Sequence, residues 1–173
     1  MRMQRFLIAA VLGFGALAAS AAPTLAVTIY ANGGRYFTAS GPANYWRYDL
    51  NEGYCGHLAG WCAPANFQWT WSMYPQYSTN YAIWRTDPAQ QYFSRAYAFI
   101  PRKDATAAAF YTVQYEYGSR STYMVNQMAY SDQWAQLGGS HYLIGAVSLS
   151  DNNQWYGGNG RYKVAFDEIK IEN

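Results

Sequence analysis

The chain has 173 residues, a formal net charge of only +2, and charged side chains at 13% of its positions. Its Lys and Arg residues form no cluster, which argues against nucleic acid as a partner, because binding to phosphates needs concentrated positive charge. Aromatic residues make up 19% of the chain, including 18 Tyr and 7 Trp. Rings with a polar tip suit two roles, filling a β-sandwich or stacking on sugars and peptides.

Residues 1–26 are predicted to be a cleaved secretory signal peptide. Two arginines precede the apolar run Phe6–Ala19, and small residues then allow cleavage after Ala22 or Ala26. The run is shorter than the ~20 residues that span a bilayer, so we expect no membrane partner after cleavage. The mature part, 27–173, carries ten basic and ten acidic residues and is long enough for one secreted, extracellular domain.

Strand patterns dominate the mature part, and helix signals are confined to a short alanine-rich patch, 105–109. In one strand an alternation with a period of two places Phe67, Trp69 and Trp71 on the same face, which we expect to point into the core. The predicted strands are 27–30, 66–73, 80–85, 92–100, 110–117, 121–126, 146–149 and 164–171.

These short strands, separated by turn residues, predict an all-β fold: an antiparallel β-sandwich with a jelly-roll-like arrangement. Gly138 is one of the residues expected to reverse the chain. Trp134 and Leu137 come just before it and are expected to plug one end of the sandwich.

Cys55 and Cys62 are the only two cysteines, and a closely spaced pair in a secreted protein predicts one disulfide. The loop between them fits two compatible roles. It staples a long loop, or it holds Trp61 and the neighbouring Tyr54 rigidly for a ligand. A zinc site is not expected, because His57 is the only nitrogen ligand nearby.

From residue 92 to 171 the chain carries an ordered series of motifs. These are Tyr97-Ala-Phe-Ile-Pro101, Gln133-Trp-Ala-Gln-Leu-Gly138, Ala146-Val-Ser-Leu-Ser-Asp151 and a closing Val164-Ala-Phe-Asp-Glu-Ile-Lys-Ile171. This order resembles the golvesin / xanthan-lyase carbohydrate-binding-like domain. The resemblance implies a β-sandwich of the kind appended to secreted lyases, peptidases and amidases, with a polysaccharide or cell-wall glycan as the partner.

Asp167 alternates with Ala165 and Ile169, so its carboxylate is expected to face the same side as core residues. A buried carboxylate needs partners. Either backbone N–H donors clasp it, or it binds a structural calcium ion together with loop carbonyls and Asp151. We expect no other cofactor.

The sequence shows no arrangement of a nucleophile with a base. The two histidines, His57 and His141, lie in no metal-binding pattern. Asp49 and Glu52 are the only acidic pair beside an aromatic loop, and most charged groups are solvated. We therefore expect a non-catalytic protein, with a small hydrolase or lyase that uses Asp49 or Glu52 as the alternative.

Rings that project from loops are the better candidates for ligand binding, because rings within strands are more readily used for packing. Trp46 nevertheless favours the core, and Trp155 fits equally well a sugar platform or a cover for a sheet edge. The preferred hypothesis is a non-catalytic module that binds extracellular or cell-wall polysaccharide through loop aromatics. The rival is a structural or protein-interaction sandwich without affinity for sugar. The candidate ligand-binding rings are Trp46, Tyr54, Trp61, Trp155 and Tyr156.

Overall fold

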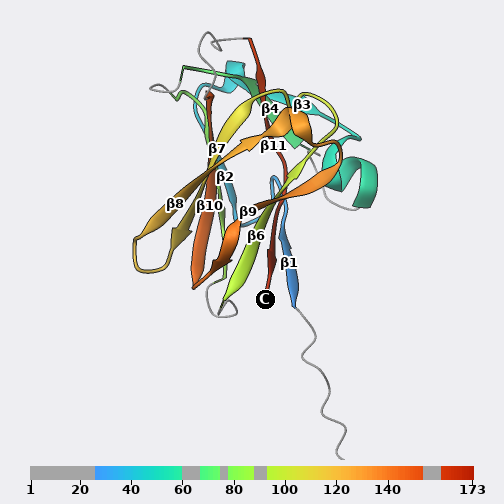
Figure 1. Ribbon diagram of the computed structural model, residues 1–173. Coiled ribbons are helices and arrows are strands. Elements are labelled where there is room, and N and C mark those ends of the chain that lie inside the picture. Colours follow the sequence, from blue (N-terminus) through green and yellow to red (C-terminus); the bar gives the residue numbers. More distant parts are fainter. Residues whose placement is uncertain (1–25, 60–66, 75–77, 88–92, 154–160) are drawn as a thin grey trace, which may run out of the picture.

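The protein is a β-sandwich of two antiparallel sheets, with a third, smaller sheet toward one end (Figure 1). The computed structural model describes residues 26–59, 67–74, 78–87, 93–153 and 161–173. The first sheet contains, in order, β1 (Val27–Tyr30), β12 (Ile169–Glu172), β6 (Ser94–Ile100) and β9 (Gln133–His141). The second contains β2 (Phe37–Ser40), β5 (Tyr81–Arg85), β10 (Ile144–Asn153), β7 (Ala108–Tyr115) and β8 (Arg120–Asn126). The third contains β11 (Lys163–Phe166), β4 (Phe67–Trp71) and β3 (Arg47–Asp49).

The chain passes repeatedly between the first and second sheets. It crosses from β5 to β6, from β6 to β7, from β8 to β9 and from β9 to β10. These crossings give the jelly-roll-like sandwich, which confirms the predicted fold class. The described helices are short: η1 (Ala43–Tyr45), the π-helix η2 (Tyr54–Ala59) and η4 (Gln127–Ala129). Within the described residues, no helix is long and apolar enough to cross a membrane.

The core lies between the inward faces of the two large sheets. Trp84 of β5, Leu149 of β10 and Ile100 of β6 are all buried there. Short side chains such as Ala98 and Ala135, which are paired across β6 and β9, leave room for these larger neighbours. Burying each large apolar side chain stabilises the fold by roughly 1.5–3 kcal/mol.

One buried polar residue ties the second sheet to the third. The amide nitrogen of Gln127, in η4, donates to the Tyr111 hydroxyl and to the Ala165 carbonyl, each at 2.9 Å. Its amide oxygen accepts the Ala165 N–H at 3.0 Å. Both polar ends of the side chain are therefore satisfied, and the residue joins β7 to β11 across the core. Burial raises the pKa of the Tyr111 hydroxyl, so this hydroxyl stays protonated.

Most predicted strands are confirmed, but β2, β3 and β9 were not expected from the sequence. The segment 164–171 forms two strands, because the chain leaves the third sheet after β11 and joins the first sheet as β12. The alanine-rich patch 105–109 forms no helix, and β7 begins within it at Ala108.

Gly138 does not reverse the chain as expected. It lies within β9, where Leu137, Gly138 and Gly139 lie opposite the single residue Ala96 of β6 at a shift in register. Gly138 has a φ of 72°, which is the left-handed backbone that a bulge of this kind uses. Glycine therefore marks a bulge here and not a turn.

The prediction that Phe67, Trp69 and Trp71 of β4 all point into the core is wrong for Trp71, whereas Trp69 is partly buried and packs against the core. Phe67 is buried, but Trp71 is 43% exposed, whereas Gln68 on the opposite face is buried. Trp69 and Trp71 pack edge to face with ring centroids 5.5 Å apart. The Lys163 ammonium lies 4.4 Å from the Trp69 centroid and 5.3 Å from that of Trp71. The two rings thus form a partly exposed pair held by cation–π contacts.

Trp134 does not plug the end of the sandwich but lies on the outer face of the first sheet. It pairs with Phe99 of β6, which alternates with core residues and therefore points outward. The Tyr54 ring of η2 packs on both, with centroids 5.1 Å from Trp134 and 5.3 Å from Phe99. These rings anchor the segment that contains the buried Cys55. Leu137, by contrast, is buried in the core.

Candidate functional site

The β7–β8 and β9–β10 turns lie at the end of the sandwich where the C-terminus lies (Figure 1), and three exposed rings lie in or near this end. Tyr117 is 79% exposed in the turn between β7 and β8, and Tyr142 is 45% exposed in the turn between β9 and β10. Phe93, just before β6, is 71% exposed, and its ring centroid lies 5.3 Å from that of Tyr142. Rings in these turns lie beyond the strand ends and cannot pack between the sheets.

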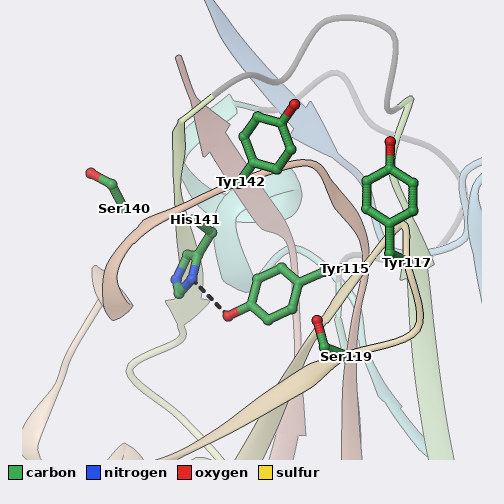
Figure 2. Close-up of a pocket in the computed structure, with 6 residues that line it drawn as sticks. All are labelled: Tyr115, Tyr117, Ser119, Ser140, His141 and Tyr142. Atoms are coloured by element: carbon green, nitrogen blue, oxygen red, sulfur yellow. Dashed lines mark hydrogen bonds between the residues drawn. The ribbon is translucent and has the colours of Figure 1, made fainter.

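Tyr117 and Tyr142 flank a hollow of about 270 Å³, which we call the end pocket. Figure 2 shows the two rings on either side of it, with their hydroxyls pointing away from the Tyr115–His141 pair. A second hollow of about 290 Å³ shares Ser140 with it and has Phe93 in its wall. The end pocket is lined by Tyr115, Tyr117, Ser119, Ser140, His141 and Tyr142.

The floor of the end pocket is a series of hydrogen bonds centred on Tyr115. Its hydroxyl lies 2.9 Å from His141 Nδ1 (Figure 2). The same hydroxyl lies 3.0 Å from Ser121 Oγ. His141 Nε2 lies 2.7 Å from the Leu137 carbonyl oxygen, which can only accept a hydrogen bond. Nε2 therefore carries a proton, and Nδ1 faces the Tyr115 hydroxyl.

The end pocket presents hydroxyls and an imidazole between flat rings. Burial raises the pKa of the Tyr115 hydroxyl, so this hydroxyl stays protonated at neutral pH. None of the six lining side chains is Asp, Glu, Lys or Arg. Such a pocket suits a polyhydroxylated ligand, whose C–H faces can stack on the rings while its hydroxyls exchange hydrogen bonds with the serines and tyrosines.

The structure places two of the five predicted ligand rings, and neither lies in the end pocket. Trp46 is 6% exposed, and its ring centroid lies 4.9 Å from that of Phe166, so it is a core residue with no face for a ligand. Tyr54 is half-buried on the outer face of the first sheet. The other members of the predicted site lie outside the described residues: Trp61, Trp155, Tyr156 and the predicted disulfide partner Cys62.

Sequence reasoning missed both rings at the rim of the end pocket. A signal for Tyr117 was present, because it ends the predicted strand 110–117 and directly precedes Gly118. Tyr142 carried no such signal, since its turn contains neither glycine nor proline. That turn instead places Leu143 in the left-handed region, with a φ of 49°.

The acidic pair considered for catalysis, Asp49 and Glu52, belongs to a charged cluster next to β3. Glu52 accepts two hydrogen bonds from the Arg102 guanidinium, both at 3.0 Å, and one from the Lys103 ammonium at 2.5 Å. These bonds lower the pKa of Glu52 to about 2. Burial raises the pKa of Asp49. Glu52 is thus a carboxylate whose oxygens are already committed to two cations.

The carboxylates considered for calcium are held by donors of the protein itself. Asp167 accepts the backbone N–H groups of Glu168 at 3.0 Å and Tyr54 at 3.3 Å, as in the first of its two predicted alternatives. Asp151 accepts from the N–H and the hydroxyl of Thr79, at 2.9 and 2.6 Å. In the described part of the chain, no three His, Cys, Asp or Glu side chains group closely enough to hold a metal ion.

Comparison with known proteins supports the fold but does not assign a function. No protein-family model matches the chain, and no curated protein matches its sequence. Among solved structures, a xanthan lyase from Paenibacillus is similar, with a TM-score of 0.60 and 15% sequence identity. The match covers 84% of this chain and 13% of the lyase, so the chain spans about an eighth of that enzyme. At this identity the likeness shows a shared fold, which agrees with the resemblance found in the sequence.

Proposed function

We propose that the protein is a secreted, non-catalytic module that binds extracellular or cell-wall polysaccharide. The observation that carries the proposal is the end pocket, where the Tyr117 and Tyr142 rings flank a floor of hydroxyls and an imidazole. The shared fold with a region of a xanthan lyase, an enzyme named for its polysaccharide substrate, agrees with this assignment.

The geometry suits binding better than turnover. The pocket has no carboxylate that could act as an acid or base on a glycosidic bond, and its histidine is tied on both ring nitrogens. Its exposed rings offer apolar faces that water covers until a ligand displaces it. Stacking of each ring then contributes about 0.5–1.5 kcal/mol beyond the buried area. The proposal also retains Trp61, Trp155 and Tyr156 as further ligand rings.

Replacing both Tyr117 and Tyr142 with Ala is expected to weaken polysaccharide binding at least tenfold, because two stacking faces are lost together. Binding is measured by retardation in native gels that contain each of a panel of extracellular and cell-wall polysaccharides. Titration calorimetry then gives the affinity for every polymer that retards the wild type. Tyr117 is 79% exposed and Tyr142 is 45% exposed, and neither belongs to the core, so the variant should unfold within a few degrees of the wild type.

The matched control is Tyr48→Ala, which removes a ring that is 59% exposed on β3, away from the pocket-lining residues. It should bind like the wild type. Equal loss in the control and the double variant would show that the end pocket is not the site. A wild-type protein that binds none of the polysaccharides would favour the rival role in protein interaction.

The proposal of secretion carries its own test by mass spectrometry. Protein recovered from the culture medium is expected to begin at Pro23 or Val27, after removal of the signal peptide. Its intact mass should be lower by two hydrogen atoms than that of the reduced chain, because Cys55 and Cys62 form a disulfide. Two alkylated thiols in the unreduced, denatured protein would contradict the predicted pairing.

A further inference from the structure

The outer face of the second sheet carries a row of basic and amide side chains across four neighbouring strands. In the sheet register Arg85 of β5 pairs with Ala146 of β10, Ala146 pairs with Gln114 of β7, and Gln114 pairs with Arg120 of β8. Directly paired residues point to the same side of a sheet, so these four form one line. With strands about 4.8 Å apart, the two arginines are separated by roughly 14 Å at the backbone.

The next line of the same face is rich in hydroxyls. Ile83 pairs with Ser148, Ser148 with Thr112, and Thr112 with Thr122, while Thr38 of β2 pairs with Ile83 at the other edge. The Thr112 and Thr122 hydroxyl oxygens lie 3.0 Å apart and share a hydrogen bond. A hydroxyl both donates and accepts, so this line keeps unused hydrogen-bonding capacity toward solvent.

A third line carries rings. Tyr81 of β5 pairs with Ser150 of β10 and is 44% exposed. On the far side Phe110 of β7 pairs with Met124 of β8, which is 49% exposed. Along the strand direction, the side chains on this face therefore change from arginines to hydroxyl-bearing residues and then to aromatic rings.

These lines surround a hollow of about 280 Å³ in the sheet face. Its walls come from β5, β7 and β10, and the Tyr81 and Phe110 side chains line it from the two outer strands of the three. The hydroxyls of β10 lie between them. The hollow is lined by Ser78, Tyr81, Ile83, Phe110, Thr112, Gln114, Ser148, Leu149 and Ser150.

The charge on this face has one sign. The outward positions of its five strands include two arginines and no carboxylate, and the nearest acids along the chain, Asp87 and Glu116, follow the ends of β5 and β7. In the described chain neither Arg85 nor Arg120 takes part in an ion pair, and both are exposed. A planar guanidinium pairs with a carboxylate through two parallel hydrogen bonds. The face is therefore complementary to a ligand that carries carboxylates along a hydroxylated chain.

We propose that the outer face of the second sheet is a second binding surface, distinct from the end pocket, and that it takes an anionic, carboxylate-bearing polysaccharide. Sugar rings stack on Tyr81 and Phe110, sugar hydroxyls bond to the line of Ser148 and Thr112, and carboxylates pair with the arginines. Two cations are too few for a nucleic acid, whose affinity depends on neutralising many phosphates.

The test compares polygalacturonate and alginate with their carboxyl-reduced forms, which keep the backbone and lose the charge. Wild type is expected to bind the charged polymers at least tenfold more tightly than the reduced ones, and added salt should narrow the difference. The double variant Arg85→Gln with Arg120→Gln should lose this preference. Tyr81→Ala should weaken binding to both forms, because the ring contacts the sugar and not the charge.

Two comparisons separate this surface from the end pocket. The Tyr117→Ala/Tyr142→Ala variant should keep the preference for charged polymers even if the proposed function at the end pocket fails. Arg102→Gln, which alters an exposed arginine elsewhere, should also keep it. Equal binding of charged and reduced polymers, an unchanged preference in the Arg85/Arg120 variant, or no binding of either charged polymer would overturn the proposal. So would a wild-type dimer in sedimentation that the same two substitutions dissociate, because the face would then join two copies of the chain.

Discussion

The wild-type protein is expected to lose stability as the pH rises from about 5 to about 8, and the substitution Glu168→Gln is expected to remove most of this loss. Glu168 is fully buried at the junction between β11 and β12. Burial raises the pKa of its carboxyl to about 8. The carboxyl is therefore a neutral acid in the fold at pH 5 and ionises there only under alkaline conditions.

The contacts of Glu168 fit the neutral form. Its Oε1 accepts the backbone N–H of Asn32 at 3.3 Å, while its Oε2 is buried without a hydrogen-bond partner. The side-chain oxygen of Asn32 is also buried without a partner. A proton on Oε2 removes the charge and makes that buried oxygen a donor, so burial costs less than it would for the carboxylate.

The sign of the pH effect follows from the two pKa values. In the unfolded chain the carboxyl loses its proton near pH 4.5, whereas in the fold it keeps the proton to about pH 8. Between these values the folded state binds more protons, so the free energy of unfolding falls as the pH rises. The loss amounts to roughly 3–5 kcal/mol over this window. It should be complete above the folded pKa.

The measurement is chemical denaturation of wild type and variant at several pH values between 5 and 9. Gln keeps the size and the Oε1 acceptor but cannot ionise, so its advantage over wild type should grow with pH. The control is Glu172→Gln, because a hydrogen bond from Lys170 lowers the pKa of Glu172. The ionised Glu172 carboxylate contributes stability above pH 4.5. The difference in the free energy of unfolding between wild type and Glu172→Gln should therefore disappear in acid. Parallel curves for Glu168→Gln and wild type would contradict the buried neutral acid.

Alternation along the sequence predicted which residues share a face but not which face is covered. In β4 the rings and the polar residues do alternate, yet Gln68 and Thr70 of the polar face are buried while Trp71 is 43% exposed. Burial is set by the partners that distant segments bring, and a single strand does not contain them. Gln68 and Thr70 show the consequence, since each keeps a buried side-chain oxygen with no partner in the described chain.

The strands missed by the sequence interpretation were missed for separate physical reasons. β3 is only three residues long, too short for a period to be visible, and β2 (Phe-Thr-Ala-Ser) has fewer β-branched residues than the predicted β1 (Val-Thr-Ile-Tyr) of the same length. β9 contains two successive glycines, and the same φ freedom that serves a turn serves its bulge at Gly138. The break between β11 and β12 lies at two acidic residues whose burial depends on backbone donors from other segments.

The candidate site was less predictable than the fold, because its parts are distant in sequence. These parts come together only after the two large sheets have packed against each other: they are the β7–β8 turn, the β9–β10 turn and Phe93. The loop rings considered as ligand candidates included Trp46, which was expected to favour the core, and the structure places it there. A ring next to a turn glycine, as at Tyr117, is the local sequence signal for a residue of the end pocket.

Gly41→Ala is expected to destabilise the protein by about 3–4 kcal/mol and to lower its unfolding temperature by roughly 10 °C. Gly41 has a φ of 116°, a backbone conformation that residues with a Cβ rarely adopt. A Cβ built there would lie 2.4 Å from the Thr79 carbonyl oxygen and 2.8 Å from the Asn80 Cα. Both are backbone atoms, so no side chain can rotate away to relieve the overlap.

The overlap also reaches a buried network, which is why the effect should exceed that of strain alone. The N–H groups of Thr79 and Asn80 each donate to the Asp151 carboxylate at 2.9 Å. Pushing this segment outward would leave a buried carboxylate short of donors, which costs more than the lost bonds.

Gly139→Ala is the matched control, because no atom lies within 4 Å of its added Cβ and its φ is not in the left-handed region. Thermal unfolding should find the control within about 0.5 kcal/mol of wild type. Similar losses in both variants would mean that general backbone stiffening, and not the contact with Thr79 and Asn80, sets the cost.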